Sequence, residues 1–197
     1  MEKIIAIGNV ANILSAFYCQ PEDGIFLDSN LHTLLVENAK SISPQLETLA
    51  SQLINSISEY DNLTLLREYT RIFLGPFEII AHPYASVYLD NYHLNGETTE
   101  KILHFYNECG LLFDEQVNDL PDNIVPVLQF LYYLVKSYVS GNQDFPNIDW
   151  IQKIGLFTDL YMKTWIPLMC EKILQGTENN FYKNLALFTK KFLEEMN

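Results

Sequence analysis

The chain has 197 residues, of which 48% are hydrophobic and 19% charged, and its formal net charge is −13 at pH 7. This length and composition fit one globular domain with a sizeable core and exclude a disordered chain. The acidity argues against nucleic acid as a partner, because a phosphate backbone requires clustered lysine and arginine, and the twelve basic residues here are dispersed.

Helical periodicity dominates the chain, and no run of strands with hairpin turns appears. The apolar N-terminal segment is predicted to be a first helix, because it lacks the cleavage site of a signal peptide. Ser43 and Pro44 are typical of an N-cap and a first helical residue, and an i, i+3, i+4, i+7 apolar stripe follows them. A later amphipathic helix follows Gly96 and is predicted to end at Gly110.

The second half of the chain has the same helical character. Pro121 is predicted to begin a helix capped by Asp119 or Leu120, and its apolar residues 124–139 are typical of a central buried helix. Pro167 is predicted to split the next helix and Gly176 to end it, before a final helix over about 178–195. We therefore predict an all-α, single-domain bundle of about eight to ten helices over residues 1–197.

Cysteine usage and hydropathy indicate the compartment. Cys19, Cys109 and Cys170 are far apart and odd in number, so neither a zinc site nor a disulfide framework is indicated. Reduced thiols are expected of a cytoplasmic protein. The longest apolar stretch, 124–135, is too short to span a bilayer. We predict a cytoplasmic protein with no stable membrane insertion and no nucleic-acid partner.

The segment from Glu68 to Tyr88 is the most informative part of the sequence. It begins as an amphipathic helix and stops at Gly75-Pro76, because proline lacks a backbone N–H and disfavours helical geometry in the residue before it. The loop that follows is rich in apolar and aromatic residues, although loops usually lie on the surface. This loop therefore either fills a core or lines a place where something apolar binds.

Two short motifs flank this loop: Ile-Phe-Leu-Gly-Pro at 72–76 and Pro-Tyr-Ala-Ser-Val-Tyr at 83–88. The pattern continues in register with Leu-Pro-Asp-Asn at 120–123 and Leu-Gln-Phe-Leu at 128–131. On these residues the chain resembles the TorD/DmsD/NarJ family of redox-enzyme maturation chaperones, over about residues 60 to 195. The resemblance implies a TorD-like helical fold that occurs as a monomer or a domain-swapped dimer.

The resemblance also implies a function without catalysis. Such a chaperone binds the leader peptide or the immature catalytic subunit of a molybdopterin oxidoreductase, assists cofactor insertion and delays export until the client has folded. The implied partners are the apo catalytic subunit, its twin-arginine leader and molybdenum-cofactor insertion proteins. Two alternatives stay open: a NarJ-like assembly factor for a non-exported, membrane-associated reductase, and a small helical nucleotide-hydrolysing enzyme.

A twin-arginine leader offers two arginines beside an apolar stretch, so its receptor requires an apolar groove with carboxylates at one end. Tyr84, Tyr88 and Phe73 are predicted to supply aromatic contact area. Asp122, with Asp90 or Asp119, is predicted to supply the charge. Core packing is the alternative for the aromatic side chains, and stabilisation of a first helical turn is the alternative for Asp122. The predicted client-binding residues are Phe73, Gly75, Pro76, Pro83, Tyr84, Ser86, Tyr88, Asp122, Asn123 and Gln129.

Two of these residues depart from the family pattern, because many members have His where this chain has Asn123 and Glu where it has Gln129. Asparagine keeps a donor and an acceptor but cannot become cationic near neutral pH. Glu100, His104 and Glu108 share a helix face, but such residues are more typical of a solvated surface than of a metal site. No glycine-rich phosphate motif is present. We predict no metal and no cofactor; weak guanine-nucleotide binding would rest on the resemblance alone.

Overall fold

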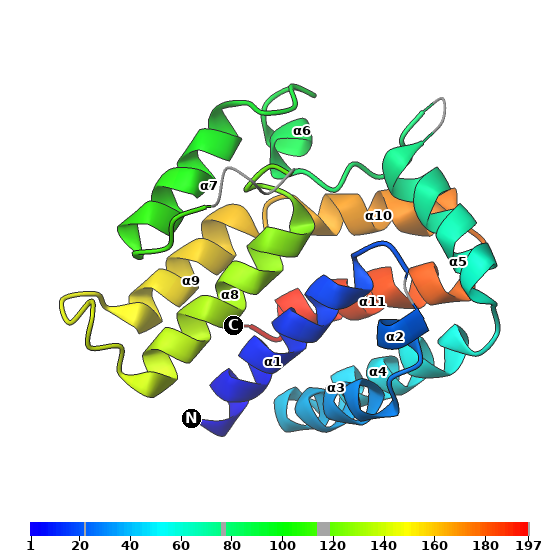
Figure 1. Ribbon diagram of the computed structural model, residues 1–197, viewed down its shortest axis with the longest axis horizontal. Helices are drawn as coiled ribbons and strands as arrows, with labels where there is room; N and C mark the ends of the chain where they lie inside the picture. Colours follow the sequence, from blue (N-terminus) through cyan, green and yellow to red (C-terminus); the bar gives the residue numbers. More distant parts are fainter. Residues whose placement is uncertain (22, 76–77, 114–118, 197) are drawn as a thin grey trace.

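The structure is a computed structural model that describes residues 1–21, 23–75, 78–113 and 119–196 (Figure 1). Nine of the α-helices in these ranges have eight or more residues, and the only extended pairing there is an isolated bridge between Tyr84 and Asn123. The predicted all-α bundle is therefore confirmed. The elements are α1 (Glu2–Phe17), α2 (Asp23–Phe26), α3 (Ser29–Ile42), α4 (Pro44–Ile57), α5 (Asn62–Tyr69), the π-helical turn η1 (Thr70–Leu74), α6 (Ala85–Leu89), α7 (Glu97–Glu108), α8 (Ile124–Ser140), α9 (Trp150–Tyr161), α10 (Ile166–Gly176) and α11 (Asn180–Glu194).

Helices α1 and α11 occupy the middle of the bundle in Figure 1, with α7, α8 and α9 on one side and α3 and α4 on the other. Helix α1 packs against both α8 and α3, and α11 packs against both α4 and α10. The short helix α6 lies beside α7 at one end of the bundle. Segments from both halves of the chain therefore meet around α1 and α11.

Local capping residues set most of the helix boundaries. Ser43 Oγ accepts a hydrogen bond from the Leu46 N–H at 3.2 Å, and Asp149 caps α9 in the same way. The predicted break before Pro167 is also observed, since α9 ends at Tyr161 and α10 runs from Ile166 to Gly176. The Ser43 cap could be predicted from sequence because an N-cap needs only its own side chain and the next three residues.

The start of α8 was predicted wrongly. The helix begins at Ile124 with Asn123 as its N-cap, not at Pro121 with Asp119 or Leu120 as the cap. Asn123 is extended, with φ −65° and ψ 147°, because its backbone pairs with Tyr84 before the helix begins. A long-range backbone contact therefore moved the boundary.

The core is rich in aromatic side chains around α8. The Phe130 ring lies 4.1 Å from that of Tyr106 and 4.8 Å from that of Phe157, measured between centroids. Such ring pairs stabilise beyond their buried area. No helix in the described ranges is both long enough and apolar enough to cross a membrane.

Two glycines within helices differ in how closely a neighbouring helix approaches them, and this difference can be tested by substitution. A Cβ added at Gly8 would lie 2.8 Å from Val135 Cγ1 across the α1–α8 contact, whereas one added at Gly155 would meet nothing within 4 Å. We expect Gly8→Ala to lower the free energy of unfolding by about 1–3 kcal/mol through overpacking. Gly155→Ala should raise it by about 0.5–1 kcal/mol, because alanine favours a helix. Urea unfolding of both variants measures this, and equal effects would contradict the close approach.

Candidate functional site

The helix that precedes the 83–88 motif ends in a π-helical turn at Gly75. The Gly75 N–H donates to the Thr70 carbonyl at 2.7 Å, and Gly75 has a φ of +50°. A Cβ at this position would lie 2.5 Å from the Glu78 carbonyl oxygen, so glycine is required by both conformation and space. The predicted helix stop is confirmed, although the predicted site residue Pro76 lies outside the described residues.

The 83–88 and 120–123 motifs are joined by short backbone pairing. The Ala85 N–H donates to the Asp122 carbonyl at 3.0 Å, and the Ile124 N–H donates to the Pro83 carbonyl at 2.8 Å. The Ser86 N–H donates to Asp122 Oδ2 at 2.8 Å across 36 positions of sequence. The two motifs therefore form one structural unit, which we call the bridge.

Asp122 lies inside the bridge and has no exposed surface. Its carboxylate accepts a hydrogen bond from the first turn of α6, where negative charge is favoured by the free N–H groups of a helix start. Ser86, which donates this bond, is equally buried. Asp122 therefore stabilises the first turn of α6, and not the first turn of α8 as the sequence alternative had it.

A groove of about 890 Å³ lies between the bridge segment and α10; we call it the α6–α10 groove. Tyr88, which lines it, is half-buried and packs on Trp165 with a centroid distance of 5.8 Å. Burial raises the pKa of the Tyr88 hydroxyl well above its usual value, so it stays a neutral donor. The groove is lined by Glu78, Ile79, Ile80, His82, Val87, Tyr88, Asn91, Tyr92, Leu168, Glu171, Lys172, Gln175 and Gly176.

The loop before the bridge divides its apolar residues between core and groove. Ala81 is buried, whereas Ile79 and Ile80 are partly exposed and line the groove. Ile80 packs so closely on α10 that a Cβ at Gly176 would lie 2.2 Å from its Cγ2. The loop therefore contributes to the core through Ala81, and the predicted binding of something apolar by its exposed residues stays a prediction.

A second cluster of polar and aromatic groups lies at the outer edge of the bridge. Tyr84 pairs with Asn123 through the backbone and is partly exposed. Burial and the nearby charge of Asp119 raise the pKa of Tyr84 to about 12. Burial, then the proximity of Cys19 and of Asp119, raises the pKa of Tyr69 to about 12. Both tyrosine hydroxyls therefore stay neutral at pH 7.

The other predicted site residues lie in different environments. Phe73 is 2% exposed and packs among Tyr18, Tyr69 and Tyr182, so its position is that of a core residue. Gln129 is exposed on α8 and does not line the α6–α10 groove.

The predicted acid Asp90 has a partner within the fold. Its Oδ2 accepts from the Thr98 N–H at 2.7 Å, and its Oδ1 accepts from the Thr98 hydroxyl at 2.6 Å. Both contacts are to the first turn of α7. Asp122 and Asp90, two of the three acids predicted to supply charge, therefore accept hydrogen bonds from the first turn of a helix. The third, Asp119, accepts a hydrogen bond from the Leu120 N–H instead.

The carboxylates on α7 are engaged in surface ion pairs. Glu108 Oε2 lies 2.6 Å from Lys153 Nζ, and Glu108 Oε1 lies 3.0 Å from His104 Nε2. Among the residues that the structure describes, no group of three or more His, Cys, Asp or Glu side chains is arranged to hold a metal ion.

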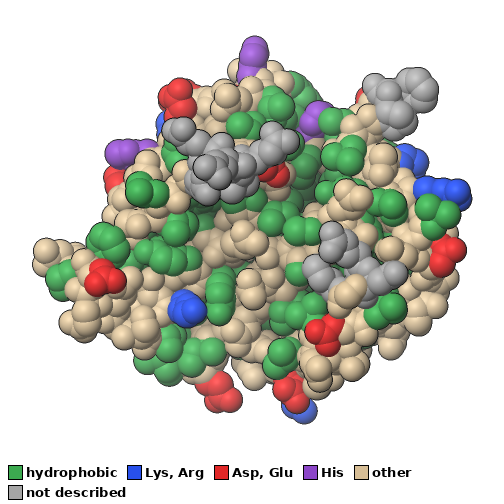
Figure 2. All heavy atoms as spheres, in the orientation of Figure 1, with side chains coloured by type: hydrophobic (Ala, Val, Ile, Leu, Met, Phe, Trp, Pro, Cys, Tyr) green, Lys and Arg blue, Asp and Glu red, His purple; other side chains and the backbone are tan. Residues whose placement is uncertain are grey.

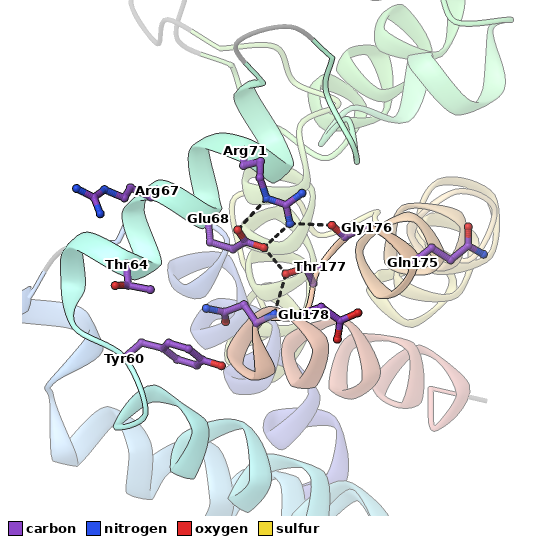
Figure 3. A pocket seen from close by; sticks show the side chains of 10 residues that line it. Tyr60, Thr64, Arg67, Glu68, Arg71, Gln175, Gly176, Thr177 and Glu178 are labelled. Carbon is purple, nitrogen blue, oxygen red and sulfur yellow. Dashed lines mark hydrogen bonds and ion pairs between the residues drawn. The ribbon is translucent and has the colours of Figure 1, made fainter.

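A second cavity, of about 690 Å³, adjoins the groove and shares Gln175 and Gly176 with it (Figure 3). At its floor Arg71 Nε donates to Glu68 Oε2 at 2.9 Å, and Arg71 Nη2 donates to the Gly176 carbonyl at 2.7 Å. The Thr177 hydroxyl also donates to Glu68. We call this network the latch, because it ties η1 to the α10–α11 corner. Its Glu68–Arg71 pair is visible in sequence as i,i+3 spacing, but Thr177, 109 positions away, is not.

Comparison with known proteins places this helical bundle among redox-enzyme maturation chaperones. Residues 39–171 match the family described as nitrate reductase delta subunit, and the chain belongs to that family. It is 25% identical over 164 residues to the chaperone protein TorD of Vibrio cholerae, which covers 79% of this chain and 71% of that protein. It is 22% identical over 174 residues to the perchlorate reductase assembly chaperone protein of Dechloromonas aromatica, which covers 83% and 77%.

The fold comparison agrees with the sequence comparison. A crystal structure of a protein from Archaeoglobus fulgidus, described as a redox enzyme maturation protein, superposes with a TM-score of 0.54 at 17% identity. The match covers 100% of this chain and 93% of that chain. At this identity the likeness shows the fold alone. The relatives found in sequence are named as chaperones and not as enzymes.

The latch generates a pH-dependent prediction. Burial opposes ionisation of Glu68, but hydrogen bonds from Arg71 and Thr177 outweigh it and hold the pKa of Glu68 below its usual value of 4.5. The stabilisation from ionised Glu68 is therefore full above pH 4.5 and is lost as the pH falls through the lowered pKa. We expect Glu68→Gln to lower the free energy of unfolding by up to about 3 kcal/mol at pH 7, and by progressively less toward pH 3.

Glu178 provides the matched control, because it lines the same cavity but its side chain is 97% exposed. Glu178→Gln should leave stability nearly unchanged at both pH values. Urea unfolding across this pH range measures both variants. A Glu68→Gln effect that does not depend on pH, or one no larger than that of Glu178→Gln, would contradict the role given to the latch.

Proposed function

We propose that this protein is a cytoplasmic maturation chaperone for a molybdopterin oxidoreductase. It binds the leader peptide or the immature catalytic subunit, assists cofactor insertion and delays export until the client has folded. The observation that carries this proposal is the α6–α10 groove, because Val87 and Tyr88 of the 83–88 motif line it together with residues of the loop before that motif. No bound cofactor is part of this role, although molybdenum-cofactor insertion proteins are expected to act on the same client.

The chemistry of the groove suits the apolar stretch of a leader. Ile79, Ile80 and Leu168 present aliphatic surface, and Tyr88 adds a flat ring with a polar tip. The amide side chains of Asn91 and Gln175 can satisfy the backbone of a bound peptide. This combination of apolar walls with a few polar groups is typical of peptide-binding clefts.

The charge of the groove is compatible with a basic ligand. Burial lowers the pKa of His82, so its imidazole is neutral at pH 7 and does not repel arginine. Glu78, Glu171 and Lys172 all line the groove, so its carboxylates outnumber its lysines by two to one. The net charge of −13 adds a long-range attraction for a leader that carries two arginines.

Chaperone action requires release as well as binding. A client that folds around its cofactor buries the apolar segments that an immature client exposes. The groove therefore discriminates between the two states of the client by differential affinity, which is sufficient to drive an ordered hand-over. The difference between the chaperone's affinities for the immature and the folded client determines release, because equal affinity for both would not shift the equilibrium between them. Moderate affinity for the immature client is therefore sufficient.

A second candidate function is assembly of a reductase that is not exported. The Leu-Pro-Asp-Asn motif at 120–123 and the nitrate reductase family match favour this alternative. Peptides with and without an arginine pair separate the two roles, because only an exported client carries the pair in its leader.

Leu168 tests the groove directly. It is 49% exposed and lines the groove from α10, so replacing it should change binding without unfolding the protein. We expect Leu168→Glu to weaken binding of a synthetic leader peptide, with two arginines and an apolar run of about 12 residues, at least tenfold, or about 1.4 kcal/mol. Calorimetric titration measures the affinity.

Leu187 on α11 is the matched control, because it is 41% exposed and does not line the groove. Leu187→Glu should bind the peptide as the unmodified protein does. If the two variants lose affinity equally, or neither does, the groove is not where the apolar segment binds.

A further inference from the structure

The α6–α10 groove is lined by one large aromatic side chain that the fold itself does not use. Tyr92 lies in the loop between α6 and α7 and is 79% exposed. Among the described residues, its side chain takes part in no hydrogen bond and no ring contact. Tyr88, which lines the same groove, is by contrast half-buried and packed on Trp165. Packing in the free protein therefore does not explain the position of Tyr92.

The backbone of Tyr92 is in a conformation that tyrosine rarely adopts. Its φ is +66°, and Asn91 before it has a φ of +53°. Glycine occupies this left-handed region freely and asparagine tolerates it, whereas a bulky side chain there is strained. Strain of this kind persists only where the surrounding structure imposes it, and it clusters at ligand clamps and other functional sites. Tyr92 therefore destabilises its loop without an offsetting contact inside the protein.

Hydrogen bonds on both sides of Tyr92 fix this loop. The Tyr92 N–H donates to the Val87 carbonyl at 3.1 Å. The His93 N–H donates to the Asp90 carbonyl, also at 3.1 Å. At the start of α7, the Thr98 N–H donates to Asp90 Oδ2 at 2.7 Å. The ring of Tyr92 is therefore carried by a backbone that is already ordered, so little entropy is lost when a ligand covers the ring.

The other residues of the groove indicate what this ring covers. The aliphatic side chains of Ile79, Ile80 and Leu168 line the same cavity. A tyrosine ring is large and rigid, so it provides contact area to an aliphatic segment at a low entropic cost. We propose that Tyr92 clamps the apolar segment of a client peptide in the α6–α10 groove and is a main determinant of the affinity for that segment. This inference rests on the proposed leader binding.

Leu94 provides the matched control for Tyr92. It lies in the same loop and is 54% exposed, but it does not line the groove. An effect that came only from exposed apolar surface on this loop would be the same for both side chains. An effect of the groove would be confined to Tyr92.

Calorimetric titration of three variants with the synthetic leader tests the proposal. Tyr92→Asn removes the ring and introduces a residue that tolerates positive φ, whereas Tyr92→Phe keeps the ring. We expect Tyr92→Asn to weaken binding by about tenfold or more, because the apolar area of the ring is no longer buried. Tyr92→Phe should retain most of the affinity, and Leu94→Asn should bind as the unmodified protein does. The loss in Tyr92→Asn should be equally large for a leader with Gln-Gln in place of Arg-Arg.

Thermal unfolding separates a clamp from a residue that only supports the fold. Because asparagine tolerates the left-handed region, Tyr92→Asn should unfold at the same temperature as the unmodified protein or at a higher one. A tyrosine with only a structural role would instead lower the unfolding temperature and the affinity together when it is replaced. Stability and affinity are therefore expected to change independently, or in opposite directions.

Each other result has a defined meaning. Unchanged affinity in Tyr92→Asn, an equal loss in Leu94→Asn, or a loss in Tyr92→Phe as large as that in Tyr92→Asn would overturn the proposal. So would a loss of affinity in Tyr92→Asn that is accompanied by lower stability. A loss that disappears with the Gln-Gln leader would assign the ring to the arginine pair and overturn its contact with the apolar segment. Absence of binding to the unmodified protein would contradict the proposed leader binding itself.

Discussion

The backbone pairing between residues 83–86 and 122–124 is the contact on which the rest of the site depends. It is short, but its hydrogen bonds determine where α6 and α8 begin. Asp122 reinforces it from inside by accepting a bond from the first turn of α6. Because a buried carboxylate is stable only with partners of this kind, the bridge and its acid depend on each other. The family motifs therefore encode one joint between two distant segments.

The groove follows from how this joint positions the loop before it. Gly75 ends η1 in a conformation that other residues adopt at a penalty, and the chain then returns so that the Ala81 N–H donates to the Ile72 carbonyl at 3.0 Å. Before the second of these points, Ile80 packs on Gly176 of α10. The latch ties the same corner from the other side. The walls of the groove are thus set before any ligand arrives, which reduces the entropy lost on binding.

Hydrophobic and charged side chains occupy different parts of the protein surface. On the face shown in Figure 2, hydrophobic side chains form patches across the middle, while most charged side chains lie near the outline. Many of the charged groups are paired with one another, as Lys153 is with Glu108 and Lys163 with Asp159. Exposed pairs of this kind add little stability, so their main effect is to keep an apolar surface in solution.

The sequence was sufficient for features that depend on near neighbours. The cap at Ser43 and the helix ends at Gly75 and Gly110 were readable, because each needs only a few adjacent residues. The motif pattern also located the segment that builds the groove.

Features that depend on distant contacts were not readable in the same way. The true start of α8 depends on Tyr84, and the latch depends on Thr177, which no local pattern connects to Glu68. The sequence also offered Asp122, together with Asp90 or Asp119, as the source of the charge. Only burial and hydrogen bonding in the folded chain distinguish them, because residue type alone does not show which carboxylates the fold has already used.

Hydrogen–deuterium exchange of the intact protein, with and without a bound leader peptide, tests the central claim most directly. It reports on the backbone of both walls of the groove in one experiment. The account predicts that the peptide slows exchange in residues 79–92 and 166–176 and leaves α3 and α4 unchanged. Saturating binding with no slowing in those two segments, or with slowing confined to α3 and α4, would contradict it.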